Sequence, residues 1–249
     1  MKIFASFFRT IIWFFYFFGY LIVHYGALKK GKQAMAAGDR ATADALAAQR
    51  VPVWCNTLLK MAGVTVTVQG KENIPTDRPC VFVANHRSYY DIPIMLTQLD
   101  QVHGMLAKAE TDKIPLVRGW MRLLGCVFVD RKDVRASMNA LNAGIAEVKS
   151  GHSFTIFPEG TRYKGAEGGV GEFKGGAFRI ALKTGAPIIP VALSNTRDIM
   201  ENNHHLMCPA HVTVRILPPI ETKDLTRAAQ KDLPLMTQQR IEAALKRSN

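Results

Sequence analysis

Residues 81–91, Val-Phe-Val-Ala-Asn-His-Arg-Ser-Tyr-Tyr-Asp, join a short apolar run to a polar turn. Pro79 precedes the run, and the length and β-branched character of Val81–Ala84 predict a buried strand. Ser88 is a favoured N-cap residue, so we expect a helix to begin near it and to continue through Ile92–Leu99. The stretch therefore predicts a strand that leads through a loop into a helix, which is typical of an α/β domain.

The chain beyond residue 63 repeats this alternation of strands and helices. Six further apolar runs are expected to be strands, and the strict Val-Thr alternation of the first is typical of an exposed edge: Val64–Val68, Met105–Ala107, Cys126–Val129, Phe154–Phe157, Ile188–Leu193 and Val212–Leu217. A helix is expected from Asp133 to Ser150, because its apolar residues share one face. We therefore predict an α/β domain over residues 64–249, with a mostly parallel or mixed sheet flanked by helices and a site beyond the strand ends.

The first 63 residues have a different composition. Between Thr10 and Leu28 only the titratable His24 can carry a charge, and Ile11–Phe18 is an unbroken apolar and aromatic run. A cleaved signal peptide is disfavoured, because no small-x-small cleavage site follows the run. A single transmembrane span fits, although residues 10–28 barely reach across a hydrocarbon core that needs about 20 residues. A helix that lies in one leaflet fits equally well, since aromatic side chains favour the headgroup boundary.

Residues 34–61 have a helix-forming composition, so residues 1–63 are predicted to form a membrane-associated helical hairpin that turns between Gly26 and Gly38. Lys29, Lys30 and Lys32 follow the apolar run, and each would add about 1 kcal/mol of attraction to anionic headgroups. If the first helix spans the bilayer, this basic cluster places the α/β domain on the cytoplasmic side. We therefore expect the protein at the cytoplasmic (inner) membrane, with the phospholipid bilayer as a partner.

The overall charge narrows the class of partner. The chain has 32 Lys and Arg against 20 Asp and Glu, a net charge of +12, which indicates nucleic acid, an acidic membrane, or a phosphate or coenzyme substrate. No nucleic-acid recognition motif is present, so nucleic acid is not an expected partner. The histidines of the C-terminal third match no zinc-binding spacing, and we expect no metal: His204, His205 and His211.

His86 and Asp91 are the first candidate pair for chemistry. A regular helix would place them about 140° apart, so they meet only if His86 lies in the loop and Asp91 in the first turns of the helix. One interpretation is structural: Asp91 closes a capping box with Ser88, and His86 is an ordinary loop residue. In the other, the carboxylate fixes the imidazole tautomer, and the second ring nitrogen deprotonates an alcohol. The chain has no GxSxG elbow, so the substrate would supply the attacking hydroxyl.

Basic residues follow three of the expected strands. Lys108, Arg131 and Arg162 would be solvated charges if taken singly, but loops at one sheet edge converge, which favours one shared anion. Arg162 ends the turn Phe157–Arg162, and its planar guanidinium matches phosphate oxygens. Glu159 is expected either to orient Arg162 or to accept a hydrogen bond from a substrate hydroxyl. The glycine-rich residues 165–176 fit a mobile lid or an ordinary surface loop equally well.

Four blocks of the chain, in this order, resemble the glycerolipid acyltransferase family that includes the 1-acyl-sn-glycerol-3-phosphate (lysophosphatidic acid) acyltransferases. Asn85–Asp91 is similar to the His-x4-Asp block, and Gly125–Arg131 to the second block. Phe157–Arg162 is similar to the third block and Ile188–Ala192 to the fourth. The resemblance covers most of the chain from about Val64 to Leu217.

The resemblance implies a reaction and roles for the candidate residues. A fatty acyl group would move from acyl-CoA or acyl-carrier protein to the free hydroxyl of lysophosphatidic acid, with no metal or other cofactor. His86 and Asp91 would be catalytic, and the substrate-binding residues would be Lys108, Arg131, Glu159, Gly160, Thr161 and Arg162. Backbone N–H groups near His86 or Gly160 are candidates for stabilising the oxyanion. Another acceptor, such as glycerol 3-phosphate or a different lysolipid, stays open, and a lipid-binding protein without activity is disfavoured by the intact blocks.

Overall fold

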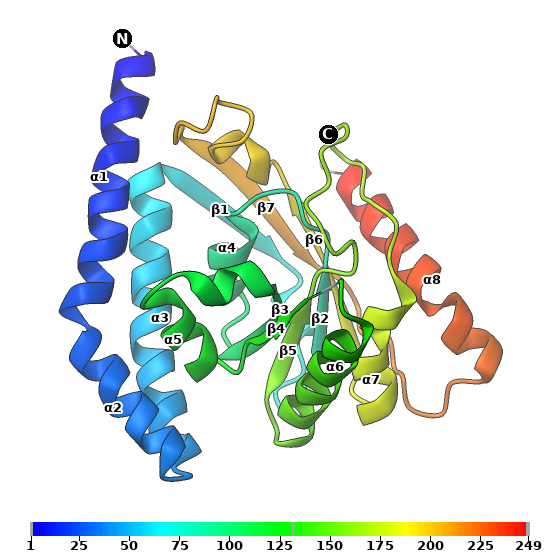
Figure 1. The fold of residues 1–249 in the computed structure, drawn as a ribbon. Coiled ribbons are helices and arrows are strands. Elements are labelled where there is room, and N and C mark those ends of the chain that lie inside the picture. The colour runs from blue at the N-terminus through cyan, green and yellow to red at the C-terminus, as the bar shows by residue number, and fades with distance from the viewer. Residues whose placement is uncertain (1, 131, 248–249) are drawn as a thin grey trace.

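The computed structural model describes residues 2–130 and 132–247, and its centre is a mixed β-sheet (Figure 1). In this part of the chain the sheet has seven strands in the order β1-β7-β6-β2-β5-β3-β4. Their bounds are β1 (Val64–Gln69), β2 (Val81–Ala84), β3 (His103–Lys108), β4 (Val127–Val129), β5 (Ser153–Ile156), β6 (Ile188–Ser194) and β7 (Ala210–Ile216). Strands β4, β3, β5, β2 and β6 are parallel, β7 is antiparallel to β6, and β1 pairs in parallel with β7. The predicted α/β class is confirmed, and β1 lies at an edge as its alternation indicated.

Helices cover both faces of the sheet. One face packs against α3 (Arg40–Ala62) and α4 (Asp91–Gln98), and the other against α6 (Val134–Lys149), α7 (Arg179–Thr184) and α8 (Arg227–Lys246). Side chains of β2 alternate between these two cores, and all four are fully buried, which explains the unbroken apolar run of a central strand. Beyond the N-terminal helices, the described chain also forms α5 (Val117–Leu123) and the 3-10 turns η1 (Lys71–Asn73), η2 (Ala109–Lys113), η3 (Gly175–Phe178) and η4 (Thr196–Ile199).

The N-terminal residues form the predicted helical hairpin. α1 (Lys2–Val23) and α2 (Tyr25–Ala36) make one arm, interrupted at His24, and α3 runs back alongside it (Figure 1). The turn lies at the C-terminal end of the predicted range, where Gly38 has a φ of +79° and the Asp39 side chain caps α3 by accepting a hydrogen bond from the Thr42 N–H. Gly26, at the other end of the predicted range, lies inside α2 and takes no part in the turn.

The hairpin shares a hydrophobic core with the rest of the chain. Trp54 of α3 and Leu28 of α2 belong to the same buried cluster as Met105 of β3 and Leu123 of α5. Gly31 lets α2 approach α5 closely, because a Cβ at this position would lie 2.6 Å from a methyl carbon of Leu123. The division of the chain at residue 63 therefore stays a prediction, since packing joins the two parts.

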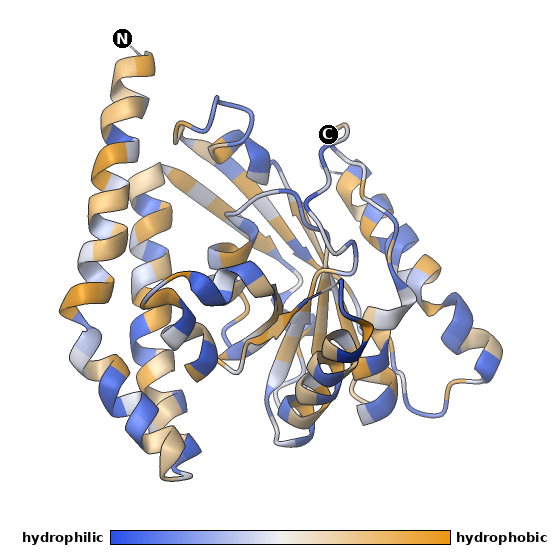
Figure 2. Cartoon of the chain, in the orientation of Figure 1, coloured by the Kyte–Doolittle hydropathy of each residue, from blue (hydrophilic) through white to orange (hydrophobic). Residues whose placement is uncertain are grey.

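Most of α1 is hydrophobic in sequence (Figure 2), and many of its apolar side chains are exposed. Phe4, Phe8 and Phe15 are 72%, 58% and 77% exposed, and they recur at helical spacing with Ile3, Phe7, Ile11, Ile12, Phe18 and Ile22. By length and composition the segment Ile3–Val23 is able to cross a membrane. Only 11% of its most apolar stretch is buried against the rest of the protein. The structure therefore leaves α1 an apolar face without a protein partner among the described residues.

Candidate active site

The site begins where β2 ends, and Asn85 fixes that point. Its side-chain Nδ2 donates to the Leu193 carbonyl at 3.0 Å, and its Oδ1 accepts from the Leu193 N–H at 2.8 Å. These two bonds extend the pairing between β2 and β6 by one residue after the backbone has left the sheet. His86 therefore leaves the carboxyl edge of the sheet from a rigid base, as expected for a site in an α/β fold.

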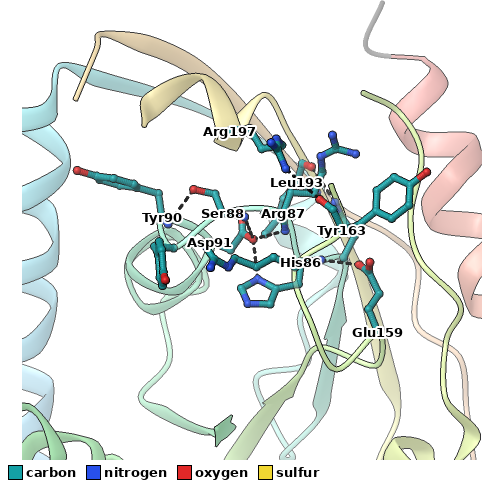
Figure 3. Close-up of polar contacts among 12 residues, drawn as sticks. His86, Arg87, Ser88, Tyr90, Asp91, Glu159, Tyr163, Leu193 and Arg197 are labelled. Atoms are coloured by element: carbon teal, nitrogen blue, oxygen red, sulfur yellow. Dashed lines mark hydrogen bonds and ion pairs between the residues drawn. The ribbon is translucent and has the colours of Figure 1, made fainter. Parts of the chain in front are cut away.

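His86 and Asp91 are in direct contact (Figure 3). His86 Nδ1 lies 2.8 Å from Asp91 Oδ2, and the imidazole stacks on the Phe157 ring with centroids 4.3 Å apart. Asp91 is completely buried at the start of α4, whereas the His86 side chain is 17% exposed. An ionised Asp91 accepts the proton of Nδ1, and this tautomer leaves a lone pair on Nε2. The geometry suits a general base at the carboxyl edge of the sheet.

Asp91 also shapes the turn that carries His86. Its Oδ2 accepts hydrogen bonds from the backbone N–H groups of Arg87 at 2.6 Å and Ser88 at 2.7 Å. α4 begins at Asp91 rather than just after Ser88, and the Ser88 hydroxyl oxygen accepts from the Tyr90 N–H at 3.1 Å. The two interpretations of Asp91 are thus compatible, because one carboxylate oxygen both closes the turn and holds the imidazole ring.

Glu159 lies beside His86 and Asp91, but its carboxylate contacts backbone N–H groups and not the imidazole ring. Its Oε1 accepts from the His86 N–H at 2.7 Å, and its Oε2 accepts from the Gly171 N–H at 2.8 Å. Burial raises the pKa of Glu159 above its ordinary value, although these N–H groups act in the opposite sense. Glu159 therefore holds the His86 backbone and not the Arg162 side chain, and its role in binding substrate stays a prediction.

The three basic residues have different surroundings. The Arg162 guanidinium lies 3.6 Å from the Tyr89 ring centroid and donates to Glu201 at 3.2 Å, next to the His86 turn. Lys108 is 63% exposed and pairs with Glu110 at 2.9 Å. Arg131 lies outside the described residues. Convergence of the three on one anion therefore stays a prediction, with Arg162 the member that the structure places in the site.

Most backbone donors expected to stabilise an oxyanion already have acceptors. The N–H groups of His86, Arg87 and Ser88 bind the two carboxylates, and the Gly160 N–H donates to the Phe157 carbonyl at 3.0 Å within its turn. In the part of the chain that the structure describes, the N–H groups of Thr161 and Arg162 have no acceptor. These two become the backbone candidates for that role.

Arg87 is the residue that sequence reasoning missed. Although it is only 2% exposed, it donates to the carbonyls of Gly165, Ala166 and Gly169 at 2.8, 2.8 and 2.9 Å. It also pairs with Glu167 at 3.3 Å. The glycine-rich segment is therefore held against the His86 turn. An arginine in a polar turn carries no sequence signal that it points inward.

The described residues contain no group of three or more His, Cys, Asp or Glu side chains suited to a metal ion. His211 instead hydrogen-bonds the Thr67 hydroxyl across strands β7 and β1 at 2.8 Å. His204 and His205 lie in a turn with positive φ. The expectation that the protein needs no metal stays a prediction.

A histidine–carboxylate pair and a guanidinium at the carboxyl edge of an α/β sheet suit the base-assisted transfer of a group to an alcohol or to water, which is the chemistry of transferases and hydrolases. Within that class, the family model "Acyltransferase" matches residues 65–194, which include the His86 turn, the Arg162 turn and strand β6. The chain belongs to this acyltransferase family.

Comparison with individual proteins shows which acyltransferases the chain resembles. The chain is 44% identical over 135 residues to the chloroplastic 1-acyl-sn-glycerol-3-phosphate acyltransferase BAT2 of Brassica napus, a match that covers 53% of this chain and 38% of that protein. It is 32% identical to the 1-acyl-sn-glycerol-3-phosphate acyltransferase of Borreliella burgdorferi, over 74% of this chain and 72% of that one. The crystal structure of the LPA acyltransferase PlsC from Thermotoga maritima is similar over 99% of this chain and 98% of that chain, with a TM-score of 0.82 and 27% identity.

Proposed function

We propose that this protein transfers a fatty acyl group from acyl-CoA or acyl-carrier protein to the free hydroxyl of 1-acyl-sn-glycerol-3-phosphate, giving phosphatidic acid. One observation carries the proposal: His86 is held through Nδ1 by the buried Asp91, on a turn that also adjoins Arg162. This pair supplies a base without a protein nucleophile, as the transfer of an acyl group to a substrate alcohol requires. The Brassica napus and Borreliella burgdorferi relatives are named as 1-acyl-sn-glycerol-3-phosphate acyltransferases, which supports the proposed acceptor.

The chemistry follows from the orientation of the imidazole. His86 Nε2 removes the proton of the acceptor hydroxyl while that oxygen attacks the thioester carbonyl carbon. The new C–O bond forms as the carbonyl electrons move to oxygen, and the Thr161 and Arg162 N–H groups stabilise the resulting negative charge. When the tetrahedral intermediate collapses, the C–S bond breaks and the imidazolium returns its proton to the thiolate. Asp91 stabilises the imidazolium throughout.

The acceptor phosphate is bound by Arg162, with Lys108 and Arg131 as further contacts, as the family resemblance implies. A guanidinium presents a planar fork of donors to phosphate oxygens, which lysine offers only as a point charge. Glu159, Gly160 and Thr161 form the turn that presents Arg162. No metal or other cofactor takes part in this scheme.

The protein docks on the membrane through α1, where its acceptor is dissolved. The apolar face of α1 enters the acyl region, and residues 1–38 contain no acidic residue that an anionic surface would repel. Lys29, Lys30 and Lys32 lie just beyond this helix and contact headgroups. The catalytic domain faces the cytoplasm at the inner membrane.

A direct assay tests the proposal. The protein, purified in detergent, is offered lysophosphatidic acid, glycerol 3-phosphate or lysophosphatidylcholine, each with acyl-CoA and with acyl-carrier protein, and products are identified by mass spectrometry. We expect phosphatidic acid from lysophosphatidic acid, and a loss of at least about 1,000-fold in turnover for His86→Ala. His204→Ala, an exposed histidine, is the control. Acylation of glycerol 3-phosphate or lysophosphatidylcholine alone would establish the other acceptor, and no acyl transfer at all would refute the function.

A further inference from the structure

Glu201 joins the two motifs of the site, although it belongs to neither. It follows β6 and the turn η4, and its side chain is only 7% exposed. Its Oε2 accepts from the Ser88 hydroxyl at 2.7 Å, and its Oε1 accepts from the Tyr89 N–H at 2.9 Å and from Arg162 Nη1 at 3.2 Å. A carboxylate so well covered requires compensating donors, and these come from the His86 turn and the Arg162 turn.

The first consequence concerns Arg162. Its guanidinium lies over the Tyr89 ring at 3.6 Å and is held at one nitrogen by Glu201, so that it is confined without a substrate. Only one of its five N–H donors is used in this contact, and the others stay available for phosphate oxygens. Because the side chain is already ordered, a bound phosphate does not have to restrict its rotamers.

The second consequence concerns the distance between phosphate and base. Ser88 and Tyr89 lie between His86 and Asp91 in the sequence, so the groups that Glu201 accepts from belong to the catalytic turn itself. One carboxylate therefore ties the cation to the element that carries the imidazole. The phosphate and the hydroxyl of the acceptor are separated by only a few bonds. A fixed distance between the Arg162 guanidinium and the His86 imidazole therefore matches the distance between these two substrate groups.

We propose that Glu201 is a positioning residue. It fixes the position of the Arg162 guanidinium relative to His86, so that Arg162 binds the acceptor phosphate while the acceptor hydroxyl lies at the imidazole. The inference rests on the proposed function, since it assigns the phosphate monoester of the acceptor to Arg162. Glu201 does not repel that phosphate strongly, because the Ser88 hydroxyl and the Tyr89 N–H share its negative charge.

The variant Glu201→Gln removes the charge while keeping the shape. Its amide oxygen can still accept a hydrogen bond, but its NH2 group cannot accept from Arg162 or Tyr89. We expect the KM for lysophosphatidic acid to rise about 10-fold, with kcat changed less than about threefold. Glu201→Asp, which withdraws the carboxylate by one methylene, should raise KM in the same sense. Glu221→Gln is the matched control, because Glu221 is 53% exposed and pairs with Arg78.

A double-mutant cycle separates this role from simple stabilisation. Arg162→Ala should raise KM on its own, and adding Glu201→Gln should then bring no further rise, because the pair acts as one unit. An equal extra rise in the Arg162→Ala background overturns the proposal, as does a fall in KM or a loss confined to kcat for Glu201→Gln. Unfolding midpoints of all variants are measured in parallel. Wild-type activity reports on the proposed function itself, and its absence overturns both claims.

Discussion

In soluble domains apolar side chains are mostly buried and charged side chains are mostly exposed, and the α1 helix and the His86 turn depart from this pattern in opposite ways. On α1, phenylalanine side chains such as Phe15, 77% exposed, point away from the protein. In the turn, Asp91 is completely buried and Arg87 is 2% exposed. Soluble domains seldom show either feature to this extent.

The exposed apolar face of α1 and the buried charges of the His86 turn are stabilised in different ways. An exposed apolar face is stable only against another apolar phase, and nothing in the described chain supplies it, which is why a bilayer is the proposed partner. A buried charge is stable only where donors or acceptors surround it, and the turn supplies them internally: Asp91 accepts three hydrogen bonds, and Arg87 donates three to backbone carbonyls. One region depends on its surroundings, whereas the other finds most of its partners within the fold, with only Asp91 Oδ1 and Arg87 Nε of these two side chains left unpartnered.

The largest effect is expected where two buried carboxylates of the site are compared. Asp91→Asn should lower kcat about 1,000-fold, because an amide facing Nδ1 favours the wrong imidazole tautomer and cannot support the imidazolium. Glu159→Gln should lower kcat only about 10-fold, because Glu159 binds the backbone of His86 and one amide oxygen retains one of its two bonds. Steady-state kinetics in detergent distinguish the two. Equal losses would show that ring contact is not what matters.

A smaller effect is expected from the exposed helix. Changing Phe4, Phe8 and Phe15 together to Ser should weaken binding to anionic phospholipid vesicles at least about 100-fold, because each ring loses at least about 1 kcal/mol of burial in the acyl region. Activity on detergent-dispersed substrate should be unchanged. Val134→Ser, an 80% exposed apolar residue on α6, is the control. Undiminished vesicle binding by the triple variant, measured by co-sedimentation, would contradict the role of α1.

The internal hydrogen bonding of the turn is tested at Arg87. Arg87→Met should lower the free energy of unfolding by about 3 kcal/mol, since three loop carbonyls lose a charged donor. Hydrogen exchange of residues 163–171 should rise at the same time. Arg197→Met removes a side chain that bonds only one loop carbonyl, that of Tyr163, and should change exchange much less. Similar exchange in both variants would mean that the loop is held by other contacts.

The smallest effect concerns His103, which is buried as fully as Asp91 but has one unpartnered ring nitrogen. Burial lowers the pKa of His103 from the ordinary 6.5 to about 4, so the unfolded chain binds a proton that the folded protein excludes. This stability is present above pH 6.5 and is lost as the pH falls toward 4. Between pH 7.5 and 5.5 the wild type should lose about 1 kcal/mol, or about 3 °C in Tm, more than His103→Gln. Parallel losses would refute the assignment.

Much of the fold and part of the site could be predicted because local patterns determined them. The β-branched runs predicted every strand of the described sheet, because strands buried on both faces are apolar along their length. The apolar stripe after Asp133 predicted the α6 helix, because the buried face of a helix repeats with helical spacing. Spacing indicated that His86 and Asp91 meet only across a loop, and the structure has that loop. The hairpin turn was predicted over too wide a range, because Gly26 and Gly38 are equivalent as sequence and differ only in φ.

The contacts of Glu159, Arg87 and Glu201 could not be predicted in the same way. Their partners lie between 12 and 113 residues away in the chain, and no local pattern records which backbone groups remain unpaired after the strands assemble. Arg87 points inward only because the glycine-rich loop folds back over it. Glu201 reaches Ser88 only because β6 pairs with β2.

The amino-acid sequence alone determined the α/β class, the apolar N-terminal helix and the pairing of His86 with Asp91, because each depends on periodicity or on residues a few positions apart. Tertiary structure alone decided which buried donor meets which acceptor, and therefore how Arg162 is held beside the His86 turn. The physical reason is that hydrogen bonding of buried groups is settled by non-local geometry, while hydrophobic burial is roughly additive along the chain.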